Sequence, residues 1–93
     1  MAEERSITKT FRIRNKLGLH ARAAAAFVKI ANRFHSEVIL RKEAVSVNGK
    51  SIMGVLMLAA SKGTDIDVSA QGDDASEAVR ALGDLINDKF GEE

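Results

Sequence analysis

Residues 6–34 read SITKTFRIRNKLGLHARAAAAFVKIANRF, and the spacing of their apolar residues changes once. Apolar and polar residues alternate over Ser6–Arg14, which predicts a half-buried strand. From Ala21 the apolar residues recur every three or four positions, which predicts an amphipathic helix. A loop containing Gly18 joins the two elements. The expected core residues are Ile7, Phe11 and Ile13 in the strand, and Ala23, Phe27, Ile30, Ala31 and Phe34 in the helix.

Two short strands are expected next, because residues 37–41 and 45–47 are rich in apolar residues at alternate positions. A tight turn near Glu43 would join them. The inward residues of this hairpin would be Val38, Leu40, Val45 and Val47.

The remaining chain predicts a helix, a strand and a second long helix. The apolar segment Ile52–Ala60 follows Ser51, a good helix N-cap residue, and Gly63 is placed to end that helix. Residues 65–71 alternate between polar and apolar side chains and predict the fourth strand. An apolar stripe over residues 78–86 predicts the last helix, and Asp74 with Glu77 has the spacing of a capping box.

The element order is therefore β-α-β-β-α-β-α in one domain covering residues 1–93. Three of the four strands have one polar and one apolar face, as strands of a half-solvated antiparallel sheet do. We predict the α+β class: an open-faced β-sandwich with a four-stranded antiparallel sheet and three helices on one face.

Composition excludes several classes of function. The chain has no cysteine for disulfides or thiolate metal sites, a net charge of +1, and only four aromatic residues, all phenylalanine. A dedicated nucleic-acid binder usually has a basic surface and stacking aromatic residues, so nucleic acid is not expected as a partner. No apolar run approaches the roughly 20 residues of a membrane span, and the first residues do not resemble a secretory signal. We expect a cytoplasmic protein without membrane insertion.

The chemistry is expected where the loop becomes the first helix. His20 stands at about the N-cap, next to backbone N–H groups that have no partner within the helix and can bind an anion. Arg22 adds a guanidinium fork that suits phosphate oxygens. An imidazole there is a nucleophile near neutral pH. Nothing in the sequence would activate a nucleotide, which favours a phosphoryl carrier over an independent catalyst. The alternative is that His20 only caps the helix and Arg22 is a solvated charge.

Two segments carry a family resemblance: GLHARAA at residues 18–24 and NGKSIMGVL at residues 48–56. They resemble the two signatures of the HPr family, phosphocarrier proteins of the bacterial phosphotransferase system, and the resemblance extends over residues 6–90. It implies that His20 accepts phosphate on Nδ1 from phosphorylated enzyme I and passes it to an EIIA-type protein of a sugar or nitrogen branch. It also implies that Arg22 and the backbone N–H groups of Ala21 and Arg22 hold the phosphate. No cofactor or metal is implied.

One residue departs from the family pattern. The family usually has proline directly after the arginine, whereas this chain has Ala23. Alanine is an excellent helix former and removes no chemical group, so the assignment of His20 stands.

The resemblance also gives roles to the second signature. Ser51 resembles the serine that HPr kinase/phosphorylase modifies in many bacteria, although as an N-cap residue it needs no further explanation. The helix after it is apolar on all sides, so part of it is expected to be exposed as an interaction site. By resemblance Ile52, Met53 and Leu56 face partners while Val55 and Leu58 enter the core. The alternative is that a loop covers the whole helix. Lys29, Lys50 and Arg22 would surround this site and attract an acidic partner.

A rival function is a regulatory HPr-like binding module that acts through Ser51 and the apolar helix 52–60 without phosphoryl transfer. The retained His20 argues against it. His35, the other histidine, lies at the expected end of the first helix and is interpreted as structural. We expect a monomer.

Overall fold

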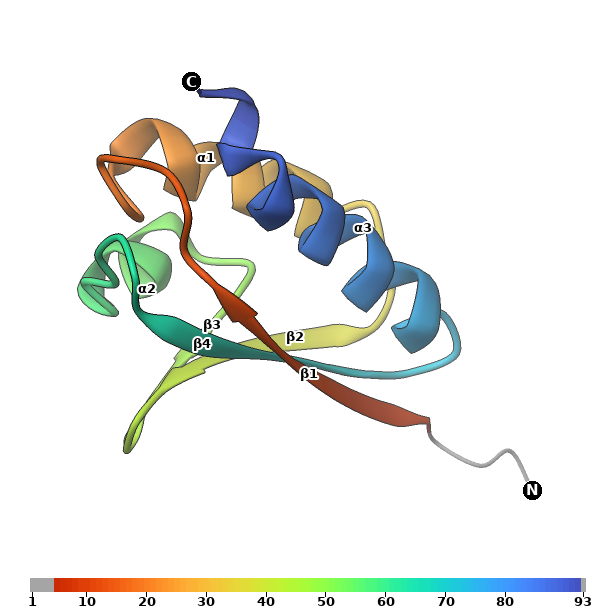
Figure 1. Cartoon of the computed structure of the whole chain (residues 1–93). Coiled ribbons are helices and arrows are strands. Elements are labelled where there is room, and N and C mark those ends of the chain that lie inside the picture. The colour runs from red at the N-terminus through yellow and green to blue at the C-terminus, as the bar shows by residue number, and fades with distance from the viewer. Residues whose placement is uncertain (1–4, 93) are drawn as a thin grey trace.

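The computed structural model describes residues 5–92 of the chain. The elements follow the predicted order and are shown in Figure 1. They are β1 (Ser6–Arg12), α1 (Ala21–Ala31), β2 (Glu37–Lys42), β3 (Val45–Asn48), α2 (Ile52–Met57), β4 (Asp65–Gln71), α3 (Ala75–Asn87) and a final 3-10 turn, η1 (Lys89–Gly91).

The four strands form one antiparallel sheet in the order β1-β4-β2-β3. The two outer strands are therefore β1 and β3. The helices pack on one side of this sheet, where α1 and α3 lie next to each other, and α2 packs against α1 (Figure 1). The predicted α+β open-faced sandwich is confirmed.

Apolar residues at alternate strand positions and on one stripe of each long helix meet between the two layers. Phe27 of α1, Leu40 of β2 and Leu82 of α3 are completely buried. The other face of the sheet is open and polar. There the side chains of Thr8, Thr10 and Arg12 in β1 lie opposite polar side chains of β4. Their side chains contact Ser69 at 2.7 Å, Asp67 at 2.6 Å and Asp65 at 3.0 Å, respectively.

Several element ends differ from the prediction. The strand expected over Ser6–Arg14 ends at Arg12, although Ile13 stays buried and continues the pairing through backbone bonds to the loop before β4. The first helix ends at Ala31, because the N–H groups of Arg33 and Phe34 donate to carbonyls three positions back and tighten the chain into turns. The side-chain amide of Asn32 also donates to the Val28 carbonyl, at 3.0 Å. His35 therefore lies beyond the helix, not at its end.

Two further expectations are wrong. The helix predicted over Ile52–Ala60 stops at Met57, because Ala59 adopts a left-handed φ of 54° well before Gly63. The sequence predicts that Val45 points inward, but its side chain is 49% exposed, because it begins β3 at the end of the β2–β3 hairpin that projects beyond the helices (Figure 1). Val47 of the same strand does pack against the core.

The predicted capping box at Asp74 and Glu77 is also wrong. Asp74 is the N-cap residue of α3, but its carboxylate makes no capping bond. It accepts instead from the backbone N–H groups of His35 and Ser36 and from the Ser36 hydroxyl, at 2.6–2.9 Å. These bonds, with the Ser36 hydroxyl contributing most, lower the pKa of Asp74 from 3.8 to about 2. The side chain thus joins the start of α3 to the segment that enters β2.

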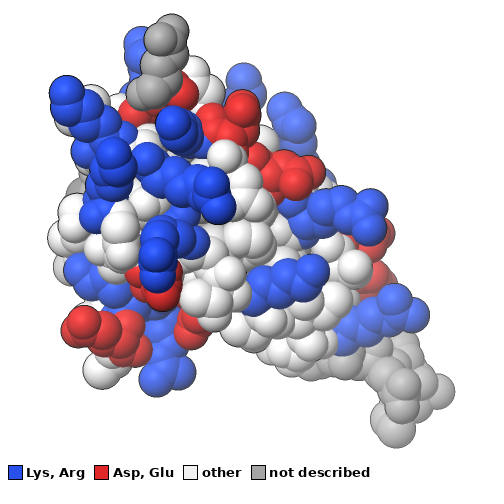
Figure 2. All heavy atoms as spheres, in the orientation of Figure 1, with Lys and Arg blue, Asp and Glu red and all other residues white. Residues whose placement is uncertain are grey.

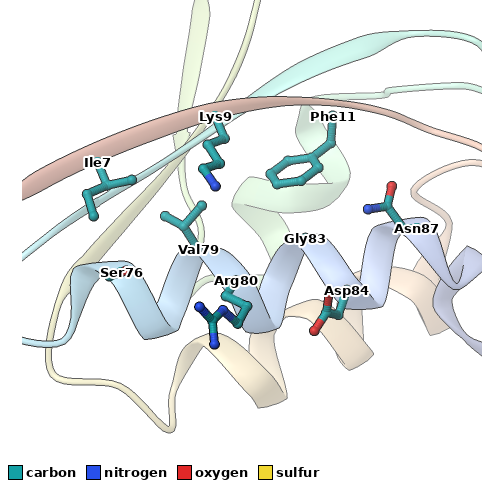
Figure 3. Close-up of a pocket in the computed structure, with 9 residues that line it drawn as sticks. All are labelled: Ile7, Lys9, Phe11, Ser76, Val79, Arg80, Gly83, Asp84 and Asn87. Atoms are coloured by element: carbon teal, nitrogen blue, oxygen red, sulfur yellow. The ribbon is translucent and has the colours of Figure 1, made fainter.

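The outer strand β1 extends over α3 and leaves a cavity of about 220 Å³ between them (Figure 3). Phe11 packs against Gly83 of α3 so closely that a Cβ at position 83 would lie 2.5 Å from the ring. Between Ile7 and Phe11, the ammonium group of Lys9 points toward the helix rather than to the open face of the sheet. A charge thus stands in the middle of the helix-facing side of an outer strand.

Within residues 5–92, none of the helices meets the length and hydropathy that a transmembrane span requires.

Candidate functional site

His20 is the N-cap residue of α1, as the sequence predicts. Its backbone is extended, and the hydrogen-bond ladder of the helix begins when the Ala24 N–H donates to the His20 carbonyl at 2.8 Å. The side chain of His20 makes no capping bond. The N–H groups of the first turn, which include Ala21 and Arg22, are therefore available to an anion.

The loop before His20 is held tightly. Gly18 has a φ of +65°, and a Cβ there would lie 2.5 Å from the Ala60 carbonyl oxygen. That carbonyl accepts from the Leu19 N–H at 2.9 Å. Only glycine fits this close approach, so the residue two positions before His20 fixes where the helix starts.

His20, Ala21 and Arg22 line one cavity of about 720 Å³ with Lys16, Leu17 and Glu92. The predicted phosphate-binding residues therefore meet at one surface site. The side chain of His20 is 27% exposed, and Arg22 and Leu17 are exposed at the rim. The cavity is large enough to admit a phosphoryl group that a second protein presents.

Glu92 is a residue of this site that the sequence analysis missed. Its carboxylate contacts Nε2 of His20 and accepts from the amide of Asn15 at 3.2 Å. Asn15 is fully buried and also donates to the Gly18 carbonyl at 2.7 Å. The carboxylate comes from a segment that is 72 positions away from His20 and carries no motif. Only the fold could identify it.

The hydrogen bond from His20 lowers the pKa of Glu92, and the bond from Asn15 and the charges of His20 and Arg22 lower it further, while burial opposes the shift. Since a carboxylate accepts a proton at Nε2, it favours the ring tautomer that leaves the lone pair on Nδ1. That tautomer follows from the hydrogen-bond network. Nδ1 makes no hydrogen bond to any residue in the described range 5–92.

The second predicted site surrounds α2. Ser51 is its N-cap residue, and the Ser51 hydroxyl accepts from the Gly54 N–H at 3.1 Å, so the predicted cap is confirmed. Ser51 is half-buried. The ammonium group of Lys50 donates to the Phe34 carbonyl at 2.7 Å and is thus held against the end of the α1 region.

The apolar side chains of α2 divide between the core and the surface. Val55 and Leu58 are buried, as predicted. The residues predicted to face partners are exposed, which contradicts the alternative that a loop covers the whole helix. Met57 also belongs to this exposed set, which we call the α2 patch: Ile52 (45% exposed), Met53 (73%), Leu56 (37%) and Met57 (74%).

No cluster of three or more His, Asp or Glu side chains in the described part of the chain has the arrangement of a metal site. His20 and His35 belong to different surroundings, because the His35 backbone is bound to Asp74.

Comparison with known proteins gives consistent matches over most of the chain. The model of the family described as "PTS HPr component phosphorylation site" matches residues 7–88. A phosphocarrier protein HPr of Neisseria meningitidis is 55% identical over 86 residues, which cover 92% of this chain and 97% of that protein.

Solved structures that are similar to this chain over most of its length are also HPr proteins. The crystal structure of HPr-C-His from Thermoanaerobacter tengcongensis is 50% identical, with a TM-score of 0.90, and the match covers 94% of this chain and 98% of that one. A structure described as an HPr dimer from the same organism is 49% identical, with a TM-score of 0.75 and coverage of 99% and 100%.

Proposed function

This chain belongs to the HPr family of phosphocarrier proteins, and on that premise we propose that it moves a phosphoryl group from phosphorylated enzyme I to an EIIA-type protein through His20. The observation that carries the proposal is the position of His20: an N-cap histidine, 27% exposed in a cavity with Arg22, whose Nδ1 has no hydrogen-bond partner among residues 5–92. We place the protein in the cytoplasm.

In the proposed transfer, the lone pair of Nδ1 attacks the phosphorus of the phosphohistidine on enzyme I. The bond from phosphorus to the donor nitrogen breaks, and its electron pair returns to that nitrogen. Phosphoryl transfer needs mainly alignment and neutralisation of the charge on the three equatorial oxygens. Arg22 and the N–H groups of Ala21 and Arg22 would supply both.

Glu92 would act on the ring from the opposite side. By holding the Nε2 proton, it keeps the lone pair on Nδ1 and the ring in position. Once phosphate is attached, the ring can keep its proton at Nε2 against the same carboxylate. Transfer to the acceptor reverses the first step, with an acceptor nucleophile at phosphorus and Nδ1 as the leaving group.

Ala23 lies buried in the first turn of α1, where the family usually has proline. It lies in regular helix directly after Arg22. We propose that the substitution changes the transfer rate or the choice of partner rather than the chemistry.

The experiment is incubation of the purified protein with phosphoenolpyruvate and a bacterial enzyme I. We expect an acid-labile phosphoryl adduct in the wild type and none in His20→Ala. The matched control is His35→Ala, which removes the other histidine and should be labelled like the wild type. An unlabelled wild type, with an HPr of known activity labelled in parallel, contradicts the proposal for that branch.

The branch is decided by repeating this reaction with the enzyme I of the sugar system and with that of the nitrogen system. Each would be tested at equal concentration, and the initial labelling rates compared. The partner that labels this chain at the higher rate identifies the branch.

We propose that partners dock on the α2 patch, on the helix that packs against α1, because exposed apolar side chains on a short helix mark an interaction surface. Met53→Glu should slow labelling by enzyme I at least tenfold. Thr8→Glu places the same charge on the open face of the sheet and should leave the rate unchanged. Equal loss in both variants would contradict docking at α2.

Ser51 is the proposed regulatory site. A phosphate on its hydroxyl would lie at the start of α2 and add about two negative charges beside the docking surface. Ser51→Asp should therefore be labelled more slowly by enzyme I than Ser51→Ala. A chain that is modified at Ser51 by a kinase but never labelled at His20 would instead be a regulatory binding module. We propose a monomer as the working form.

A further inference from the structure

A third surface cavity, apart from those around His20 and between β1 and α3, has a chemistry that the carrier function does not use. It has a volume of about 340 Å³ and is lined by Arg12, Ile13, Arg14, Lys62, Gly63 and Lys89. None of these residues lines the cavity around His20. Four of the six are cationic, and we call Arg12, Arg14, Lys62 and Lys89 the basic cluster.

The cluster is held by backbone structure from three separate parts of the chain. The Ile13 N–H donates to the Thr64 carbonyl at 2.9 Å, and the Gly63 N–H donates to the Ile13 carbonyl at 2.8 Å. These bonds fasten the end of β1 to the loop before β4. They therefore fix the arginines on either side of Ile13 close to Lys62.

Lys89 reaches the cavity from the turn after α3. Its φ of 57° and the φ of 56° at Phe90 are both left-handed, a conformation that non-glycine residues rarely adopt. Phe90 is buried, at 7% exposure, and anchors this turn. Backbone strain of this kind persists only where surrounding structure imposes it, and it concentrates at functional sites.

The positive charge of the cluster is largely uncompensated. Arg12 pairs with Asp65 at 3.0 Å. Arg14, Lys62 and Lys89 have no ion pair with any residue of the described chain, 5–92. The cluster carries four positive charges, and the Asp65 carboxylate that pairs with Arg12 offsets one of them. A charge of +3 therefore remains around the cavity. In Figure 2, several Lys and Arg side chains lie close together on the left of the molecule, with Asp and Glu side chains near them, and both signs occur over the rest of that face.

We propose that the basic cluster binds a soluble, phosphate-bearing small anion with two or more negative charges, such as a nucleotide or a doubly phosphorylated metabolite. Two guanidinium groups favour phosphate, because each planar fork can give two parallel hydrogen bonds to its oxygens. Gly63 has a φ of +88° and open space where a side chain would stand, so a ligand can approach the backbone there. The cavity is open to solvent, and its volume of about 340 Å³ leaves room for a small anion.

The site is separate from His20, so it is tested without any phosphoryl transfer. Inorganic tripolyphosphate is titrated into the ¹⁵N-labelled protein at about 0.15 M salt, an ionic strength that screens loose surface charges. We expect saturable amide shifts at residues 12–14 and 62–64. In the double variant Arg14→Gln/Lys62→Gln, affinity measured at these amides should fall at least tenfold.

The matched control is Lys29→Gln/Arg33→Gln, which removes the same charge from exposed positions in and after α1. It should bind tripolyphosphate like the wild type at residues 12–14. Dispersed amide spectra of both double variants establish that they are folded. An equal loss in the control variant would mean general charge attraction and would overturn the site.

Three further results would overturn the proposal. Citrate binding as tightly as tripolyphosphate would remove the preference for phosphate. Shifts confined to residues 20–22 would place the anion at the carrier site alone. Binding to phosphatidylglycerol vesicles with no response to tripolyphosphate would indicate a membrane surface instead of a soluble ligand.

Discussion

The two ring nitrogens of His20 have different surroundings, and this difference organises the site. Nε2 contacts the Glu92 carboxylate, whereas Nδ1 makes no contact of this kind among residues 5–92. Local sequence predicts the position of His20 and Arg22, because a helix start is a local property. It could not predict Glu92, whose position depends on Asn15 and on the left-handed turn around Phe90.

The pKa of Glu92 provides a direct test of this contact. Because the bond from His20 is the main cause of its lowered pKa, His20→Ala should raise the pKa of Glu92 toward its ordinary value of 4.5. The measurement is a ¹³C NMR titration of the glutamate carboxyl carbons.

Asn15→Ala is the comparison, since Asn15 contributes less to the lowering. It should raise the pKa of Glu92 by a smaller amount. If the carboxyl carbon titrates identically in the wild type and in His20→Ala, the contact between the two side chains does not exist in solution.

Ser51 provides a second test at this scale. Ser51→Ala removes the acceptor for the Gly54 N–H and should lower the free energy of unfolding by about 1 kcal/mol. Ser51→Asp, which restores an acceptor, should recover most of that loss. Urea denaturation measures both, and Ser76→Ala, at an exposed position in α3, is the control.

The sequence predicted which segments are helices and strands, and their order, better than it predicted the residues at which each element ends. The period of the apolar residues identified every strand and long helix, because that period reflects which side is buried. The ends depend on tertiary contacts. The left-handed residue that ends α2 is Ala59 rather than a glycine, and Asp74 bonds to the β2 entry instead of capping α3. No pattern in the neighbouring sequence predicts either the left-handed Ala59 or the bonding of Asp74 to the β2 entry.

The contact between β1 and α3 predicts the effect of a single methyl group. Gly83→Ala would place a Cβ only 2.5 Å from the nearest ring atoms of Phe11, which is closer than two non-bonded carbon atoms can approach. We expect the free energy of unfolding to fall by about 1–2 kcal/mol, because overpacking outweighs the helix propensity that alanine adds.

A double-mutant cycle separates this clash from other effects. In the Phe11→Leu background, the same change at Gly83 should be neutral or stabilising, since the ring is gone. A Gly83→Ala variant that is equally destabilised in both backgrounds would show that Phe11 is not the cause.

At the scale of the whole molecule, Asp74 joins two parts of the fold and makes stability depend on pH. Its pKa is about 2 in the folded state against 3.8 for the free group, so the unfolded chain binds more protons between these values. The stabilisation is complete above about pH 4 and is lost as pH falls toward 2.

Asp74→Asn removes this titration. We expect the variant to be less stable than the wild type at pH 6 and the difference in unfolding free energy to disappear as pH falls toward 2. Thermal unfolding at a series of pH values measures it. A difference that stays constant down to pH 2 would show that the charge of Asp74 contributes nothing.

Lys9 lies at the midpoint of the seven-residue outer strand β1. An unpaired strand edge is a template for another strand, and an inward-facing charge is one way that proteins block it. If two copies aligned their β1 edges antiparallel about a central two-fold axis, each Lys9 would stand opposite the other. Repulsion between the two ammonium groups opposes this symmetric pairing. A strand that places a carboxylate opposite Lys9 could still pair with β1. The β1 edge is thus protected against symmetric pairing with its own copies, and concentrated solutions of this protein should resist aggregation through this edge.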